Sequence, residues 1–285
     1  MKPASFDYYA ARSVAEAVAL LKEHGDEGKV LAGGQSLVPA MNFRLARPEV
    51  LIDVNPVAEL DYIEETEGIL RIGSLVRHMK LEHREVHDPL GRLLKTAARH
   101  VGHMPIRVRG TFGGSLAHAD PAAEWCVISA LLDGEMIAQS SEGQRSIPAK
   151  DFFQTVFTTD LRTTELLSET RLPVLPATSK VGFTEFSRRA GDFALTMAAV
   201  VLDLHDGKVD TARIALGGIS DRPIRAVETE RGLHGREVGE ALSAEIGEST
   251  ADEVEPMGDI HGSAEYRRDL VRVLTKRAVD QAISG

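Results

Sequence analysis

The sequence lacks several features that mark particular classes of protein. It contains one cysteine, Cys126, among 285 residues, which excludes an internal disulfide and any cluster built from several cysteines. It has no apolar run approaching the roughly 20 residues that span a bilayer. The opening segment 1–7 is polar and aromatic and does not resemble a secretory signal. We therefore expect a cytoplasmic protein without a transmembrane segment, in which Cys126 is a buried structural thiol.

Positive charge is also scarce. The chain carries 33 Lys and Arg against 43 Asp and Glu, a formal net charge of −10, which argues against nucleic acid or an anionic membrane as the main partner. No Ser–His–Asp order surrounds a nucleophile elbow, so we predict no catalytic side chain. His83 and His87 share a helical spacing but lack a third ligand, so we read them as a solvated helix end and predict no metal site.

Two glycine clusters carry most of the information. The first is 32–36 (AGGQS) and the second is 111–121 (TFGGSLAHADP). Glycine allows positive φ and a close approach of backbone to ligand, and successive exposed N–H groups form a nest that suits a pyrophosphate. Neither cluster contains lysine, and the first has neither dinucleotide-fold nor P-loop spacing. We read both as turns that favour a large diphosphate cofactor over a nucleoside triphosphate.

The pattern around the clusters places each beside a helix. Residues 13–24 predict a helix, 29–32 a strand, and 50–54 a second strand, with Ser36 capping a helix between the strands. The first cluster then lies at a helix N-terminus, where the helix dipole adds positive charge. A helix at about 89–101 precedes a connection that contains Pro105, Arg107 and Arg109. Asp120 and Pro121 fit the N-cap and first position of a further helix that ends near Gly134.

The C-terminal part begins beyond Pro173 and Pro176. Apolar runs on both sides of Asp206-Gly207 predict a β-hairpin over 199–216. The acidic stretch 244–262 is poor in apolar residues and predicts a mobile surface loop. The last helix is expected from about Ser263, and the residues expected on its apolar side are Tyr266, Leu270, Val273, Leu274 and Ala278.

Three segments carry a resemblance to a known family: 32–37 (AGGQSL), 110–124 (GTFGGSLAHADPAAE) and 188–194 (RRAGDFA). They resemble the FAD-binding medium subunit of molybdenum hydroxylases, of which the carbon monoxide dehydrogenase medium subunit is the type member. The resemblance covers essentially the whole chain. It implies an α+β fold with a two-lobed PCMH-type FAD-binding domain at 1–175, whose lobes are about 1–55 and 56–175. A smaller α+β domain of the CO dehydrogenase flavoprotein C-terminal type would follow at 177–285.

The resemblance also implies a function. The chain would be the FAD-dependent oxidoreductase subunit of a heterotrimer that assembles as a dimer of heterotrimers. The large partner subunit would hold molybdopterin cytosine dinucleotide and the small one two [2Fe-2S] clusters. Electrons would pass from molybdenum through the clusters to FAD and then to an external electron acceptor. A stand-alone flavin-dependent oxidoreductase of the same fold and a flavin-free structural subunit stay open as alternatives.

Carried over residue by residue, the resemblance implies that the FAD diphosphate and ribityl chain lie between the two glycine clusters. Two acidic residues would lie near the cofactor, and apolar or aromatic side chains would pack on it. The implied FAD-binding residues are Ala32, Gly33, Gly34, Gln35, Ser36, Leu37, Val101, Thr111, Gly114, Ser115, Ala117, Asp120, Glu124, Leu167 and Phe193.

Three positions depart from the family pattern. Val108 stands where relatives usually carry Asn, and Phe193 stands where they often carry Tyr over the flavin ring. Phenylalanine can still stack on the ring but lacks the hydroxyl. Glu185 falls where many relatives have Lys near the flavin. This leaves Arg188 or Arg189 as the nearby source of positive charge.

Overall fold

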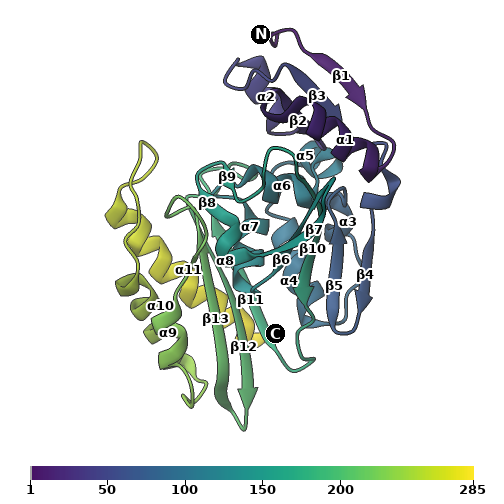
Figure 1. Ribbon diagram of the computed structural model, residues 1–285. Helices are drawn as coiled ribbons and strands as arrows, with labels where there is room; N and C mark the ends of the chain where they lie inside the picture. Colours follow the sequence, from purple (N-terminus) through teal and green to yellow (C-terminus); the bar gives the residue numbers. More distant parts are fainter. Residues whose placement is uncertain (1) are drawn as a thin grey trace.

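The computed structural model describes residues 2–285 and divides into three parts that follow one another along the chain (Figure 1). The N-terminal lobe contains a parallel sheet of order β1-β3-β2. Its elements are β1 (Asp7–Ala10), α1 (Val14–His24), a 3₁₀ turn η1 (Gly25–Glu27), β2 (Gly28–Leu31), α2 (Leu37–Asn42) and β3 (Val50–Asp53). The predicted order helix, strand, glycine turn, helix, strand is confirmed.

The N-cap residue and the spacing of the apolar residues both favour a helix at α1. Ser13 Oγ accepts a hydrogen bond from the Glu16 backbone N–H at 3.1 Å, as a helix N-cap should. The apolar stripe of α1 then packs on β3 in a separate small core whose buried members include Ala17, Val18, Leu21, Val50 and Ile52. The same core takes in Leu60, Leu75 and Leu166 of the central lobe, and the glycine turn projects from the end of β2.

The central lobe is built on an antiparallel sheet of order β4-β5-β10-β6-β7. Its strands are β4 (Ile63–Thr66), β5 (Ile69–Gly73), β6 (Glu135–Ser140), β7 (Gly143–Pro148) and β10 (Leu166–Pro173), with a small ribbon of β8 (Phe153–Thr155) and β9 (Thr158–Thr159). Its helices are the 3₁₀ turn η2 (Ala58–Leu60), α3 (His78–Glu82), α4 (Pro89–Ala98), α5 (Met104–Arg109), α6 (Phe112–His118), α7 (Glu124–Leu131) and α8 (Ala149–Phe152). Cys126 is fully buried on α7, as expected.

The C-terminal part is a four-stranded antiparallel sheet of order β11-β12-β13-β14. Its elements are β11 (Lys180–Phe186), β12 (Thr196–His205), β13 (Lys208–Gly217), β14 (Ile224–Arg225), α9 (Val227–Gly232), α10 (Glu240–Glu253) and α11 (Ala264–Ser284). The predicted hairpin is confirmed: Asp206 and Gly207 both have positive φ, at 49° and 75°, as a two-residue hairpin turn requires.

This sheet is covered on both faces. Helix α11 lies on one face, and its approach to β11 is so close that a Cβ at Gly182 would come within 1.9 Å of the Ala278 carbonyl oxygen. The other face, which carries Phe183, Met197 and Val201, shares a core with the central lobe. Helices α4 and α7 lie against it there (Figure 1). Side chains of the C-terminal part therefore reach into the central lobe through this seam.

Two sequence expectations for the C-terminal part are wrong. Most of the stretch 244–262 is not a loop, because α10 occupies it up to Glu253 and packs on α11. Its inward face uses small and hydroxyl side chains, such as Ser243 and Thr250, which hide the apolar periodicity. In α11, Tyr266 and Val273 are exposed. The expected Leu274 and Ala278 are buried, and the buried face as a whole comprises Arg267, Val271, Leu274, Thr275, Ala278, Val279 and Ala282.

No helix within residues 2–285 combines the length and the apolar character needed to cross a membrane.

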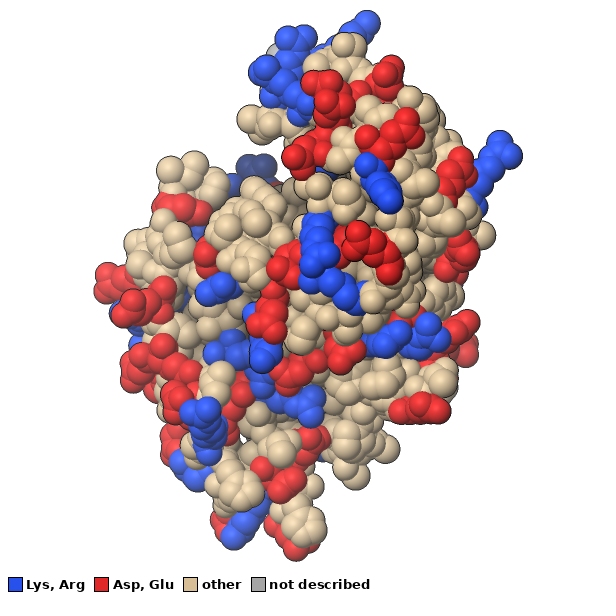
Figure 2. All heavy atoms as spheres, viewed as in Figure 1, with Lys and Arg blue, Asp and Glu red and all other residues tan. Residues whose placement is uncertain are grey.

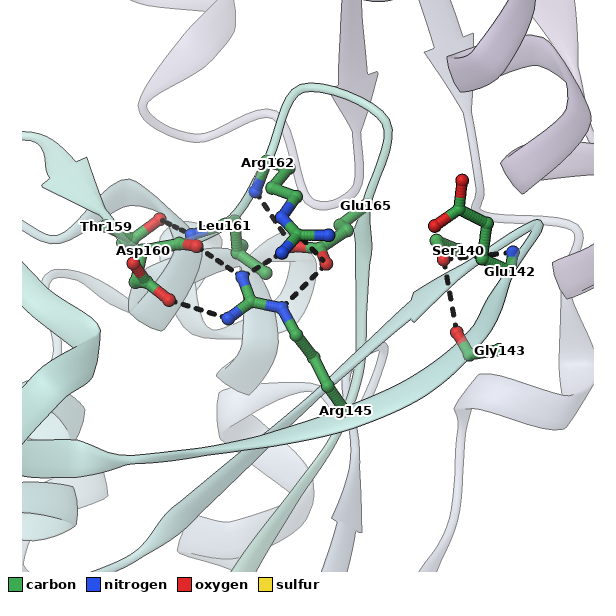
Figure 3. A network of polar contacts seen from close by, with 9 residues as sticks. All are labelled: Ser140, Glu142, Gly143, Arg145, Thr159, Asp160, Leu161, Arg162 and Glu165. Atoms are coloured by element: carbon green, nitrogen blue, oxygen red, sulfur yellow. Dashed lines mark hydrogen bonds and ion pairs between the residues drawn. The ribbon is translucent and has the colours of Figure 1, made fainter.

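An arginine clamp fixes the strand that carries Leu167 (Figure 3). Arg145 on β7 donates to both carboxylate oxygens of Glu165 at 2.7 Å, and to Asp160 at 2.7 Å. Glu165 is 3% exposed at its side chain. Burial alone would raise its pKa, but hydrogen bonds from Arg145 and from the Arg162 backbone N–H bring that pKa below its usual range. The clamp ties the end of the loop before β10 to the β6–β7 hairpin.

We expect Arg145→Met to lower the free energy of unfolding by about 2–3 kcal/mol, because it leaves the Glu165 carboxylate buried and without its partner. Urea unfolding followed by circular dichroism measures this. The matched control is Arg231→Met, which removes an exposed pair with Glu228 and should cost less than about 1 kcal/mol. Equal costs for the two variants would contradict a buried clamp.

Candidate cofactor-binding cleft

The two glycine clusters meet in space. A Cβ placed on Gly33 would lie 2.4 Å from the Arg109 carbonyl oxygen and 2.7 Å from Gly110 Cα. A Cβ on Gly114 would lie 3.7 Å from Ala32 Cβ. Only a residue without a side chain allows the N-terminal lobe to approach the central lobe this closely. The glycine at position 33 is therefore required for the two clusters to form one site.

The first cluster forms the turn between β2 and α2, as predicted. Gly34 has φ of 73°, which favours glycine. The backbone amides of Gly33, Gly34, Gln35 and Ser36 donate no hydrogen bond within the described residues. Ser36 holds the N-cap position of α2, but its side chain makes no capping hydrogen bond, contrary to expectation. These groups are left to bind a ligand.

A cavity of about 330 Å³ opens at this turn. It lies where β2 and β3 end, with the first cluster and α2 on one side and Arg109 from the central lobe on the other. The lining residues are Leu31, Ala32, Gly33, Gly34, Gln35, Val38, Pro39, Asp53, Asn55 and Arg109. Ligands commonly bind beyond the carboxyl ends of parallel strands, and this cleft has that position.

The cleft is electrostatically positive on its central-lobe side. Asn55 Nδ2 donates to the Ala32 carbonyl at 2.7 Å, and Arg77 Nη2 donates to Asn55 Oδ1 at 2.7 Å. Arg77 also donates to the Arg109 carbonyl. Burial, followed by the charge of Arg109, lowers the pKa of Arg77. Neither arginine forms a salt bridge within residues 2–285, so their charge is available for an anion.

Sequence reasoning singled out Arg109 but missed Arg77 and Asn55. Asn55 could have been found, because it follows the C-terminal end of a predicted strand close to the first cluster. Arg77 could not, because it lies about forty residues after the first cluster and no local pattern links the two. Arg107, the other arginine singled out, is instead structural: its Nε donates to Glu82 at 2.7 Å and its Nη1 to the Gly102 carbonyl at 2.8 Å.

The second cluster is a helix rather than an open turn, which corrects the sequence interpretation. Thr111 is the N-cap of α6, and its Oγ1 accepts from the Gly114 N–H at 3.0 Å. The amides of Phe112, Gly113 and Ser115 also donate within the chain. The sequence prediction failed because the N-cap hydrogen bond made by the Thr111 side chain stabilises the helix more than Gly113 and Gly114 destabilise it. This cluster therefore offers a helix surface with little side chain, and the first cluster offers the free amides.

Two neighbouring boundaries also differ from expectation. The connection with Pro105 and Arg107 is itself the short helix α5. Helix α7 begins at Glu124, not at Pro121, because Asp120 Oδ1 accepts from the Ala122 N–H at 2.9 Å and forms a local turn instead of an N-cap. These changes leave Asp120 and Glu124 partly or fully buried beyond the end of α6.

The remaining residues predicted to bind the cofactor lie partly at the edge of the cleft and partly outside it. Leu37 begins α2 at its edge, whereas Ser115 and Ala117 lie on α6. Val101 and Leu167 belong to the hydrophobic core that the central lobe shares with the C-terminal sheet. Phe193 is 68% exposed in the loop between β11 and β12 and does not line the cavity. Within the described residues, no group of three His, Cys, Asp or Glu side chains could hold a metal.

A buried histidine anchors the start of the second cluster. The Trp125 indole N–H donates to His78 Nδ1 at 2.9 Å. The other ring nitrogen faces Gly110, where an added Cβ would come within 2.6 Å of it. Burial, with smaller effects from the charges of Arg77 and Arg107, lowers the pKa of His78 to about 3. His78 is therefore neutral at physiological pH and fixes the backbone just ahead of Thr111.

Matches to family models and to individual proteins all indicate the same protein family. Residues 4–175 match the family described as FAD binding domain in molybdopterin dehydrogenase, and residues 182–282 match the CO dehydrogenase flavoprotein C-terminal domain. The chain is 40% identical over 284 residues to the 6-hydroxypseudooxynicotine dehydrogenase complex subunit alpha of Paenarthrobacter nicotinovorans, which covers 99% of this chain and 96% of that protein. It is 33% identical over 290 residues to the carbon monoxide dehydrogenase medium chain of Hydrogenophaga pseudoflava, covering 99% and 98%.

Solved structures agree with the sequence matches. A chain of carbon monoxide dehydrogenase from Hydrogenophaga pseudoflava superposes with a TM-score of 0.94 at 34% identity, covering 100% of this chain and 99% of that one. A chain of quinoline 2-oxidoreductase from Pseudomonas putida 86 also gives a TM-score of 0.94, at 38% identity and the same coverage.

The neutral His78 makes stability depend on pH. An unfolded histidine titrates near 6.5 and this one near 3, so its contribution is complete above pH 6.5 and is lost as the pH falls toward 3. Lowering the pH from 6.5 to about 5 should cost about 1.5 kcal/mol through this residue alone. Urea unfolding of His78→Gln should show a shallower loss than the wild type. The control, exposed His87→Gln, should keep the wild-type slope; identical slopes for all three proteins would contradict the assignment.

Proposed function

This chain belongs to the family of FAD-binding medium subunits of molybdenum hydroxylases, and we propose that it transfers electrons through FAD bound between its two glycine clusters. The electrons would come from [2Fe-2S] clusters in a partner subunit and pass to an external acceptor. The observation that carries the proposal is the cleft itself: unbonded amides at 33–36 share a cavity with Arg109, which forms no salt bridge within the described residues, and Arg77 lies behind Asn55 of the same cavity.

The residues present fit the cofactor. A diphosphate carries negative charge on oxygens that accept hydrogen bonds from backbone N–H groups and guanidinium groups. The amides of the first cluster, the hydroxyl of Ser36 and Arg109 would hold it, with Arg77 adding positive charge from behind Asn55. Helix α6 presents glycines that let the cofactor lie close to the backbone. When bound, FAD supplies the electron-carrying chemistry. The chain's own groups bind and orient it.

We further propose the contact set and the domain division implied by the resemblance. The FAD-binding residues would be the fifteen named above, with Val101 and Leu167 closing the apolar floor, and with Phe193 reaching the ring only from the exposed β11–β12 loop. The FAD-binding domain would span 1–175, with lobes divided near 55, and the C-terminal domain 177–285. The family matches at 4–175 and 182–282 support this division.

We also propose that the chain assembles with a molybdenum-containing large subunit and an iron–sulfur small subunit, as a dimer of heterotrimers in the cytoplasm. One feature that supports contact with another subunit lies at the tip of the N-terminal lobe. Phe43 and Leu45 are 67% and 84% exposed there, beside Arg44 and Arg47, and Figure 2 shows basic side chains gathered at this tip. Exposed apolar groups of this size favour a partner.

The two alternatives have less support. A stand-alone oxidoreductase needs an acid or base over its own substrate cavity. The one carboxylate that lines this cleft, Asp53, is already bonded to the Asn55 backbone N–H at 2.9 Å and to the Tyr8 hydroxyl at 2.6 Å. A flavin-free structural subunit has no use for unbonded amides in an intact glycine turn.

Purification after co-expression with neighbouring genes of the operon tests the assembly. We expect two co-eluting subunits and an absorption spectrum that combines flavin bands with iron–sulfur absorbance. A colourless chain that elutes alone and stays colourless after addition of FAD would overturn the proposal. Turnover by the isolated flavin-loaded chain would favour the stand-alone alternative.

Substitution at the cleft tests the binding site. Arg109→Gln should weaken FAD binding by about ten- to a hundredfold, because a charged hydrogen bond to the diphosphate contributes about 1.5–3 kcal/mol. The matched control is Arg99→Gln, an exposed arginine outside the cleft, which should retain wild-type flavin content. FAD release on dilution, measured by flavin fluorescence, gives both values. Equal retention in the two variants would contradict this placement of the diphosphate.

A further inference from the structure

The loop between β11 and β12 presents Phe193 to solvent. The Phe193 side chain is 68% exposed, whereas Ala194 and Leu195, which follow it, are buried. An exposed aromatic ring on a free loop would occupy many positions, and each contact that restricts it costs conformational entropy. The contacts of the loop backbone therefore decide where the ring is presented.

Gly191 anchors the middle of this loop on the central lobe. It has φ of 85°, and a Cβ there would lie 2.2 Å from Nδ1 of His103, the N-cap residue of α5. Within the loop, the Asp192 N–H donates to the Arg189 carbonyl at 3.0 Å, and the Ser187 hydroxyl donates to the same carbonyl at 2.9 Å. The loop up to Asp192 therefore has a defined shape against the start of α5.

Arg267 on α11 holds the other end of the loop. Its Nη1 donates to the carbonyls of Leu195 and Gly218, and its Nη2 forms an ion pair with Asp259 at 2.7 Å. Arg267 is 5% exposed, although it lies on the otherwise largely apolar inner face of α11. A guanidinium carries its donors in a fixed planar fork, so one side chain can hold two carbonyls and a carboxylate in a defined geometry.

Gly218 connects this anchor to the second glycine cluster. Its N–H donates to the carbonyl of Pro121, the last residue of the cluster, at 2.9 Å. Gly218 has φ of 76°, and a Cβ there would lie 2.8 Å from the Leu195 carbonyl oxygen, so a side chain would separate the two carbonyls that Arg267 bridges. Arg267 therefore fixes Leu195 relative to the cluster against which FAD is proposed to lie.

We propose that Arg267 is a positioning residue for the flavin, which holds the end of the β11–β12 loop so that Phe193 packs on the flavin ring. This inference rests on the proposed function. Arg267 acts through the backbone of Leu195, two residues after Phe193, and does not itself contact the cofactor. Because segment 191–195 is held at His103 and at Arg267 before FAD binds, little conformational entropy is lost when the ring is stacked.

A double-mutant cycle on FAD binding to the assembled complex tests the proposal. Phe193→Ala should weaken FAD binding about three- to tenfold, which is the contribution expected of one aromatic stack. Arg267→Met should weaken it to a similar extent, because the loop no longer presents the ring. The variant with both substitutions should bind FAD as Phe193→Ala does, since the group that Arg267 positions is gone. FAD release on dilution, followed by flavin fluorescence, gives all three values.

The matched control is Arg268→Met, which replaces the exposed neighbour on α11 and should keep wild-type FAD binding. Arg267→Lys retains the cation without the planar fork, so it should lie between Arg267→Met and the wild type. The visible circular dichroism of the bound flavin should shift in Arg267→Met toward the spectrum of Phe193→Ala. A role in general stability alone would leave this spectrum unchanged.

The cycle separates positioning from a purely structural role. If Arg267→Met weakens FAD binding by the same factor with and without the Phe193 ring, or if either single variant binds FAD as the wild type does, the proposal is overturned. If Arg267→Met does not assemble, the cycle is run with Asp259→Asn, which removes the half-exposed charge that orients the guanidinium. A smaller loss that requires the Phe193 ring supports the proposal, and any other result overturns it. A wild-type complex without flavin would instead contradict the proposed function.

Discussion

The close approach of Gly33 to the backbone at Arg109 and Gly110 is the constraint on which the site depends. The core of the N-terminal lobe continues into the central lobe through Leu60, Leu75 and Leu166, so apolar packing joins the two lobes but does not by itself set the spacing at the glycine clusters. At the cleft, a Cβ on Gly33 would lie 2.4 Å from the Arg109 carbonyl oxygen. The absence of a side chain at this position therefore determines how closely the two lobes approach there. It brings unbonded amides from one lobe and positive charge from the other to the same cavity.

The second constraint is the way the central lobe fixes its own side of the cleft. His78, held by Trp125, determines the path of the backbone at Gly110, and the Thr111 cap then turns the following glycines into a helix. Arg77 reaches across to Asn55 and so ties the end of β3 to the same region. The cleft is thus supported by side chains that contact the backbone behind it rather than the ligand space. This arrangement keeps the ligand-facing surface almost bare.

Local signals in the sequence were sufficient for much of the fold and for half of the cleft. The cap at Ser13, the turn at 32–36 and the Asp206-Gly207 hairpin are determined by neighbouring residues, and the structure confirms them. Arg77 was not predicted because its role depends on hydrogen bonds to Asn55 and Arg109, which are distant from it in the sequence. Helix α10 escaped prediction because its buried face mixes Leu242 and Ile246 with small and hydroxyl residues, which weakens the apolar periodicity.

Trp125 is the only tryptophan in the chain, and it contacts both His78 and Phe112 at the start of the second glycine cluster. Tryptophan emission overlaps the near-ultraviolet absorption of flavins, so energy transfer from this indole would report cofactor occupancy without any label. The same emission would respond to the protonation of the histidine that accepts its N–H. The residue that anchors the cleft therefore also provides a built-in optical probe of its state.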